Sequence, residues 1–217
     1  FAFAALKTDG SVVTWGGSET GGDSSLVAAS LSDGVLTITP NGTAFAAIKS
    51  NGSVVTWGYD SYGGDSSTAA NLLADGVIEV FRNSFAFAAL KADGSVVSWG
   101  SGSYGGDSSA VAEQLAGGVT TISSTRSAFA VLKEDGSVVT WGRSEDGGSS
   151  FSVADSLTGG VTQIFSTMAA FAALKEDGSV VTWGDSLYGG FSATELALSE
   201  GTATTLFNTD RAFAALM

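Results

Sequence analysis

Hydrophobic residues recur along this chain with a long, fixed period. A run of small and large apolar residues, as at 87–90, is followed by a polar pair and then by a second apolar run that ends in tryptophan. The pattern repeats every 42 residues without insertion or deletion, and its tryptophans are Trp15, Trp57, Trp99, Trp141 and Trp183. This periodicity predicts a tandem array of one structural element, in which the tryptophans supply core bulk.

Two short β-type runs open each repeat and enclose an Asp-Gly or Asn-Gly pair. In the third repeat the runs are 87–91 and 95–100, and the pair is Asp93-Gly94. Such pairs tolerate the positive φ that tight hairpin turns require, so the pattern predicts an antiparallel hairpin in every repeat. The first run does not alternate apolar and polar residues, which predicts a strand buried on both faces between two layers.

The remainder of each repeat is a loop rich in Gly and Ser, a short apolar stretch and a third β-type run. The stretch 109–115 carries Ala, Val and Leu at helix-like spacing after Ser109, which predicts one or two helical turns with a Ser cap. A Gly, usually followed by Val, opens the third run, as at 160–165. This order of elements fits the length of a propeller blade.

We therefore expect an all-β protein of tandem 42-residue repeats, a β-propeller of about five blades, with an open β-solenoid or repeat array as the alternative. One repeat domain is expected over residues 1–217. Its repeats are expected at about 1–42, 43–84, 85–126, 127–168 and 169–210, with a partial sixth repeat at 211–217.

The two ends of the chain compete for one place in a closed ring. Phe3 and Phe213 are five periods apart, so a five-bladed ring would put residues 1–7 and 211–217 at the same position. Either one end frays, the ring is not five-fold, the chain is a slice of a longer array, or the spare strand completes a neighbouring molecule. A start at Phe1 inside a predicted strand is typical of a fragment or a processed product.

The stretch from Leu132 to Gly142, Leu-Lys-Glu-Asp-Gly-Ser-Val-Val-Thr-Trp-Gly, resembles the repeat of the regulator-of-chromosome-condensation family of β-propellers. The resemblance covers all five repeats and implies the blade fold. These repeats are shorter than is usual for that family, and Gly-Gly-Asp-Ser-Ser replaces its Gly-Gln-Leu-Gly element, so the family's nucleotide-exchange activity is not carried over. The Ala-Phe-Ala-Ala-Leu-Lys wording is also similar to repeats of very large bacterial surface and secreted proteins, which implies an extracellular setting.

Composition argues against several classes of function. Acidic residues outnumber basic ones by 22 to 9, which gives a formal charge of −13 and opposes binding to nucleic acid. The chain has no Cys and no His, so it lacks disulfides, thiolate metal sites and the commonest general base. No nucleophile elbow or phosphate loop stands out. No apolar run approaches the roughly 18 residues of a membrane span. We expect no catalytic residues, and no enzyme.

Two sets of loop residues are candidates for ligand binding. The first set precedes Gly-Gly in a polar loop and comprises Tyr62, Tyr104 and Tyr188, whose equivalents elsewhere are Thr20 and Asp146. The second set lies in identical Gly-Gly-Asp-Ser-Ser loops and comprises Asp23, Asp65 and Asp107. One carboxylate and two hydroxyls per loop fall short of the six to eight oxygens that Ca²⁺ takes, so Ca²⁺ is the weaker interpretation and a Ser- or Asp-capped turn is favoured.

A lysine also ends the first strand of every repeat, at Lys7, Lys49, Lys91, Lys133 and Lys175. A solvated hairpin end is favoured over a ring of lysines for anionic ligands, because few other basic residues accompany them.

These observations favour a non-catalytic structural or adhesive module of a large extracellular or cell-surface protein or filament. Its expected partners are other copies, head to tail, or neighbouring repeats of a parent chain. The alternative is a lectin-like propeller that binds glycans, with one shallow pocket per repeat and affinity multiplied by multivalency. The Asp of the loop becomes Ser149 and Phe191 in the last two repeats while Trp is kept, which favours the structural function.

Overall fold

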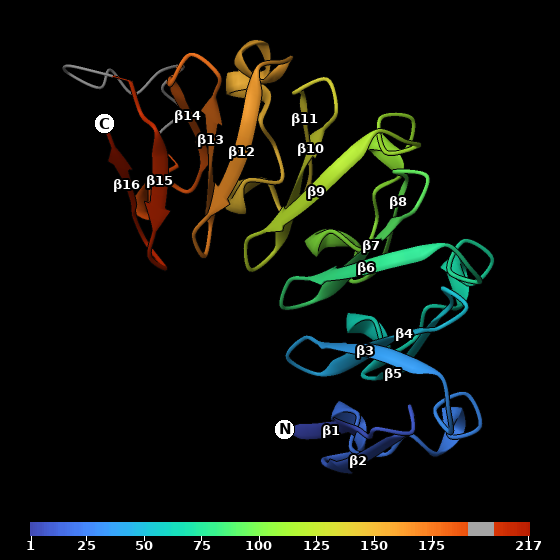
Figure 1. Ribbon diagram of the computed structural model, residues 1–217. Helices are drawn as coiled ribbons and strands as arrows, with labels where there is room; N and C mark the ends of the chain where they lie inside the picture. The colour runs from blue at the N-terminus through green and yellow to red at the C-terminus, as the bar shows by residue number, and fades with distance from the viewer. Residues whose placement is uncertain (191–201) are drawn as a thin grey trace. The chain divides into compact units, whose positions relative to one another are not determined.

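The computed structural model describes residues 1–190 and 202–217 (Figure 1). The chain packs as two compact parts, an N-terminal half, Phe1–Ser108, and a C-terminal half, Ser109–Met217. Each half is a succession of short sheets, and each is described by itself. The prediction of one domain over 1–217 stays a prediction.

The strands of the N-terminal half are β1 (Ala2–Leu6), β2 (Val12–Gly16), β3 (Val35–Pro40), β4 (Ala44–Lys49), β5 (Val54–Gly58), β6 (Val77–Arg82), β7 (Ala86–Lys91) and β8 (Val96–Gly100). Those of the C-terminal half are β9 (Val119–Ser124), β10 (Ala128–Lys133), β11 (Val138–Gly142), β12 (Val161–Ser166), β13 (Ala170–Lys175), β14 (Val180–Gly184), β15 (Thr205–Asn208) and β16 (Phe213–Leu216).

The loops between strands contain short 3₁₀ helices. In the N-terminal half they are η1 (Ser18–Thr20), η2 (Ser25–Val27), η3 (Asp60–Tyr62), η4 (Ser67–Ala69) and η5 (Gly102–Tyr104). In the C-terminal half they are η6 (Ser109–Val111), η7 (Ser144–Asp146), η8 (Phe151–Leu157) and η9 (Ser186–Tyr188).

The described strands form short antiparallel sheets, and none of these sheets closes on itself. Their strand orders are β1-β2, β3-β4-β5, β6-β7-β8, β11-β10-β9, β12-β13-β14 and β15-β16. Each three-stranded sheet takes its outer strand from one sequence repeat and its hairpin from the next, as when β3 pairs with β4 from Val35↔Lys49 to Pro40↔Phe45. The predicted all-β fold in tandem repeats is confirmed, but the sheet is offset from the sequence repeat by one strand.

The predicted hairpins are confirmed, with β4 and β5 paired from Ala44↔Gly58 to Ile48↔Val54. Gly52 of the connecting turn has φ +77°, which a glycine adopts without a steric penalty. The preceding Asn51 uses its side-chain oxygen to accept hydrogen bonds from the backbone N–H and the hydroxyl of Ser53, at 3.0 and 2.8 Å. The turn residues thus form a small closed network on their own.

In the three-stranded sheets the first strand of the hairpin is buried on both faces, as its unbroken apolar pattern predicted, whereas β1 of the two-stranded sheet is partly exposed. Every residue of β4 from Ala44 to Ile48 is buried, and the same holds for β13 from Ala170 to Leu174. Both strands are the middle strand of their sheet, so other strands cover their edges and neighbouring layers cover their faces. Alanine is common there because a small side chain lets adjacent sheets approach.

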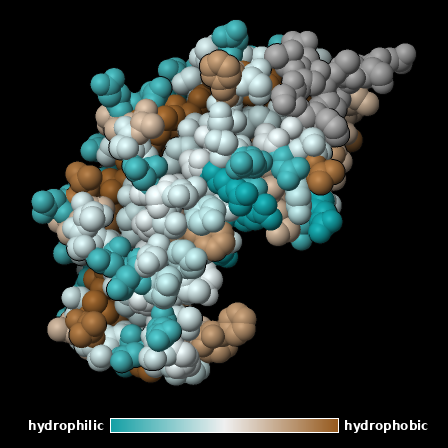
Figure 2. Space-filling model, turned by 180° about the vertical axis from the view of Figure 1, so that it is seen from behind, coloured by the Kyte–Doolittle hydropathy of each residue, from teal (hydrophilic) through white to brown (hydrophobic). Residues whose placement is uncertain are grey.

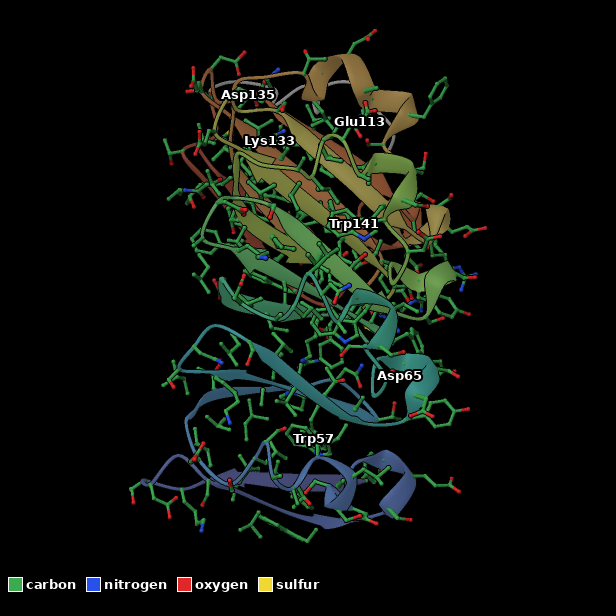
Figure 3. The ribbon with its side chains drawn as sticks, turned by 90° about the vertical axis from the view of Figure 1, so that its right-hand side faces the viewer. Trp57, Asp65, Glu113, Lys133, Asp135 and Trp141 are labelled. Carbon is green, nitrogen blue, oxygen red and sulfur yellow. The ribbon has the colours of Figure 1, made fainter. Side chains whose placement is uncertain are left out.

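Successive repeats are joined by an aromatic pair beneath a glycine loop. Phe45 and Trp57 stack with ring centroids 5.1 Å apart, and the Trp57 indole N–H donates to the Gly21 carbonyl of the preceding repeat at 3.0 Å. Trp57 lies between the sheet β1-β2 and the sheet β3-β4-β5 (Figure 3). In the C-terminal half the Trp183 indole donates to the Gly147 carbonyl in the same way. The predicted packing role is confirmed for Trp57, Trp99, Trp141 and Trp183, which are buried, but not for Trp15, which is exposed.

The helical segment differs in detail from its prediction. Ser24, Ser66 and Ser150 directly precede 3₁₀ helices, but none of these side chains caps its helix. Their hydroxyls bond a threonine of the neighbouring strand instead, as Ser24 does with Thr14 at 2.9 Å. The serine predicted as the cap, Ser109, is instead the first residue of η6, as Ser25 and Ser67 are of η2 and η4.

The glycine loop has little room for a side chain. Gly63 has φ +101°, and a Cβ there would lie 2.6 Å from Cδ2 of Phe87. We expect Gly63→Ala to lower the free energy of unfolding by about 3 kcal/mol, measured by urea denaturation, because it adds backbone strain to a steric clash. Gly102→Ala is the matched control, since its nearest neighbour would be Cβ of Asp107 at 3.5 Å. Equal losses in the two variants would contradict this account.

Candidate functional site

The structure brings two of the three predicted aspartates into one groove of the N-terminal half. Asp23 and Asp65 both line a groove of about 680 Å³ between the loop after β2 and strand β5 with the loop that follows it. Glu19 and Asp60 also line this groove. Asp107, the third predicted aspartate, lies one repeat further on and does not line it. Figure 3 shows Asp65 on the loop that follows β5.

Both groove aspartates hold the start of a helical turn. An oxygen of Asp23 accepts the backbone N–H of Ser25 at 2.9 Å, and one of Asp65 accepts that of Ser67 at 2.8 Å. These backbone hydrogen bonds, followed by bonds from the serine hydroxyls, lower the pKa of both carboxyls below the ordinary value. The Asp-capped turn favoured by the sequence is confirmed, and both side chains carry a negative charge at neutral pH.

The carboxylates are dispersed around the groove. Within residues 1–190 and 202–217, no group of three or more Asp, Glu, His or Cys side chains is placed to hold a metal ion. Ca²⁺ takes six to eight oxygens at about 2.3–2.6 Å, which requires the ligands to converge on a point. The arrangement fits several separated positive charges better than one small cation.

The predicted tyrosines separate into two different surroundings. In the N-terminal half, Tyr62 and Tyr104 flank Phe85, with ring centroids 5.1 and 4.6 Å from it, and Tyr59 extends the row from Tyr62 at 5.1 Å. These four residues form an aromatic cluster whose outermost member, Tyr59, is 44% exposed. The cluster brings together two predicted site residues on one surface.

Tyr188, the third predicted tyrosine, lies among charges in the C-terminal half. The guanidinium carbons of Arg126 and Arg211 lie 6.0 and 5.5 Å from the centre of its ring. Arg126 also forms two hydrogen bonds with buried Asp146, at 3.0 and 3.1 Å. These hydrogen bonds are the main cause that raises the pKa of Arg126 above its ordinary value. Asp146 occupies the position that tyrosine holds in three other repeats, so an ion pair replaces aromatic packing there.

A hydrogen bond from the strand turn holds each tyrosine loop, and the sequence analysis missed it. The donors are Asn41, Asn83, Thr125 and Thr167, and the acceptors are the carbonyls of Tyr62, Tyr104, Asp146 and Tyr188. The sequence does have Asn or Thr at these positions every 42 residues, but they lie in a turn whose other residues do not repeat. These bonds fix the loops from which the aromatic cluster projects.

The repeated lysines are also used by the fold. The Lys49 ammonium donates to the carbonyl of Ser30 at 2.6 Å, and that of Lys175 donates to the carbonyl of Ser156 at 2.9 Å. Lys91 and Lys133 make the equivalent bonds. These four lysines therefore fasten their hairpin ends to the loop of the preceding repeat, whereas Lys7 of the first repeat pairs with Asp9.

Comparison with known proteins identifies the fold. No protein-family model and no curated protein sequence matches the chain. Among solved structures, human WBSCR16 superposes with a TM-score of 0.52 at 16% identity, covering 94% of this chain and 67% of that protein. Prp20p from Saccharomyces cerevisiae, whose binding properties concern Gsp1p and histones, gives 0.50 at 16% identity, with 84% and 55% covered. The CRINKLY WD40 ectodomain of the Arabidopsis thaliana receptor kinase ACR4 gives 0.50 at 13% identity, with 96% and 74% covered.

These likenesses establish a fold of RCC1-like β-propeller repeats, as the sequence pattern predicted. The chain spans about two thirds of the human protein and little more than half of the yeast one. At such identities the likeness concerns the fold alone. Within the described residues, no helix combines the length and apolarity needed to cross a membrane.

The turn aspartates provide a prediction about pH. The hydroxyl and then the backbone N–H of Ser95 lower the pKa of Asp93. We expect Ser95→Ala to raise that pKa, measured by NMR titration of the side-chain carboxyl, while the pKa of Asp135 in the next repeat stays unchanged as the control. Because the folded-state pKa is depressed, the associated stability is present at neutral pH and is lost as pH falls below about 4. If the pKa of Asp93 is the same with and without the substitution, this assignment of the cause is wrong.

The Arg126–Asp146 pair provides a prediction about stability. Asp146 is 1% exposed, so Arg126→Ala leaves a buried carboxylate without its cation. We expect a loss of about 2–4 kcal/mol in the free energy of unfolding. Adding Asp146→Tyr should restore most of it, because tyrosine occupies this position in other repeats. If the double variant is no more stable than the single one, the buried charge is not the cause.

Proposed function

We propose that this chain is a non-catalytic structural module of a large extracellular or cell-surface protein or filament, and that its repeats join to further repeats of the same kind. The proposal rests on one observation: the residues that the repeats share serve mainly to hold the repeats together. Beyond the first repeat, the side chains that recur make contacts within the fold, whereas several exposed loop positions change between repeats.

The recurring polar residues illustrate this use. Lys49 fastens a hairpin end to the preceding loop, Asp93 closes a turn and Trp57 bonds the preceding glycine loop. The loop positions vary: Tyr62 corresponds to Asp146, and Asp65 corresponds to Ser149. A module selected for one ligand per repeat would keep its ligand-binding residues, while a structural array needs only the contacts between repeats.

The first hairpin offers a surface for such joining. Phe3 and Trp15 stack at 5.5 Å, yet they are 59% and 51% exposed. Their equivalents Phe45 and Trp57 are only 6% and 4% exposed, under the loop that contains Gly21. Figure 2 shows hydrophobic residues at the surface, mixed with hydrophilic ones, at its lower end, where Figure 1 places β1 and β2. A glycine loop of a further repeat, from the same chain or a second copy, has the shape that fits this pair.

Sedimentation velocity over a range of concentrations tests the proposal. We expect the chain to self-associate at high concentration, and Trp15→Asp to abolish the association because it places a charge on the apolar face. Leu26→Asp is the matched control, since Leu26 is fully exposed on a loop outside this face. A chain that stays monomeric throughout, or two variants that behave alike, would count against joining through this surface.

The cellular setting needs its own measurement. Antibodies raised against the chain should label intact cells of the organism that makes it, or detect it in the medium. Labelling only after the cells are opened would remove the extracellular part of the proposal.

The aromatic cluster favours a second candidate, a lectin-like module. Exposed tyrosines can bind the apolar faces of sugar rings while their hydroxyls bond the sugar hydroxyls. On this hypothesis a glycan array would detect binding, and Tyr62→Ala with Tyr104→Ala would remove it. An array without signals would leave the structural module as the better account.

A further inference from the structure

The groove between the first two repeats combines an apolar floor with an acidic rim. Its apolar floor includes Val55 of β5 and Val27 of η2 from the preceding repeat, which both pack against the buried cluster around Trp57. Its rim carries four carboxylates, those of Glu19, Asp23, Asp60 and Asp65, together with several serine hydroxyls. The volume of about 680 Å³ lies within the range of pockets that hold small ligands or side chains.

No basic side chain lines this groove among the described residues that form it. The nearest candidate, Lys49, donates to the carbonyl of Ser30 at the groove's edge and lies 3.4 Å from Asp33, so its charge is already paired outside the groove. All four rim acids belong to exposed positions on loops. The groove therefore presents uncompensated negative charge above an apolar surface.

The C-terminal half contains a groove that overlaps the equivalent place in part. It extends to the hairpin end, and the counterparts of the four rim acids do not line it. Its volume is about 530 Å³, and Val111, Val138 and Val139 take the places that Val27, Val54 and Val55 hold two repeats earlier. Ser144 and Ser149 replace Asp60 and Asp65 in the sequence. Its charged lining residues are Lys133 and Asp135, which lie close together at the hairpin end (Figure 3). The backbone architecture thus recurs, but the excess of negative charge does not.

We propose that the acidic groove of the N-terminal half binds an extended polypeptide segment that carries two or more lysine or arginine side chains. The aliphatic stems of these side chains pack on the valine floor, and their charged ends reach the carboxylates of the rim. Dispersed carboxylates match charges spaced along a strand of peptide. The absence of a converging metal cluster in the described residues argues against a bound cation of small radius.

The test uses fluorescence anisotropy with a short labelled peptide of alternating lysine and valine. We expect binding that weakens steeply as salt is raised, because the attraction is between exposed charges. The double substitution Asp23→Asn with Asp65→Asn should weaken binding about fivefold to tenfold. Both turns should survive it, since Asn51 shows that an amide oxygen accepts the same type of hydrogen bond.

The matched control is Glu134→Gln with Glu176→Gln, which removes the same charge from exposed positions in the C-terminal half. It should change the affinity less than twofold. A second groove variant, Ser18→Lys, places a competing cation on the rim and should also weaken binding. Because it leaves both aspartates in place, its effect cannot come from a disturbed turn in the double variant. Equal losses in control and groove variants would overturn the proposal, because the attraction would then come from net charge alone.

Two competitors decide the class of ligand. Ca²⁺ that displaces the peptide more strongly than NaCl of equal ionic strength would overturn the proposal in favour of a metal site. Spermidine that binds as tightly as the peptide would overturn the assignment to a polypeptide. A competitor peptide of alternating glutamate and valine should have no effect.

Discussion

The stack of phenylalanine and tryptophan beneath a glycine loop is the contact on which the rest of this structure depends. From the second repeat to the fifth it buries the largest apolar side chains, and the indole N–H of Trp57 or Trp183 fixes the distance to the preceding loop through one hydrogen bond. Glycine is required there because a Cβ at Gly21 would lie 2.6 Å from the Phe45 ring. The pairing of strands from successive repeats, the hydrogen bonds of the lysines and those that hold the loops before Gly-Gly all require successive repeats to lie at this distance.

Much of the fold was predictable because each repeat contains local signals that agree with one another. The Asp-Gly pairs, the buried run of β4 and the tryptophan period pointed to the same hairpin, and the structure has it. The offset between sheet and sequence repeat was not predictable, since periodicity gives the length of a repeat but not its starting point. The Ser cap was predicted one residue too late, because Ser109 already begins η6.

The candidate sites were less predictable, because they depend on contacts between residues far apart in sequence. The tyrosines were expected to act alike, but Phe85 gathers Tyr62 and Tyr104 into a cluster while Arg126 and Arg211 surround Tyr188. The acidic groove combines Asp23 with Asp65 from successive repeats, and no local pattern places the two together. The repeats thus share one backbone fold and differ in the charge and polarity of their loop side chains.

The offset of the sheets has a consequence for how such a chain can change its length. A sheet such as β3-β4-β5 takes strands from two successive repeats, so no boundary within the 42-residue period is privileged. A duplication or loss of one full period restores every strand pairing, wherever in the period its ends fall. Unequal recombination between repeats can therefore lengthen or shorten the gene in whole periods without disrupting a sheet, and the acidity of individual grooves can then diverge independently.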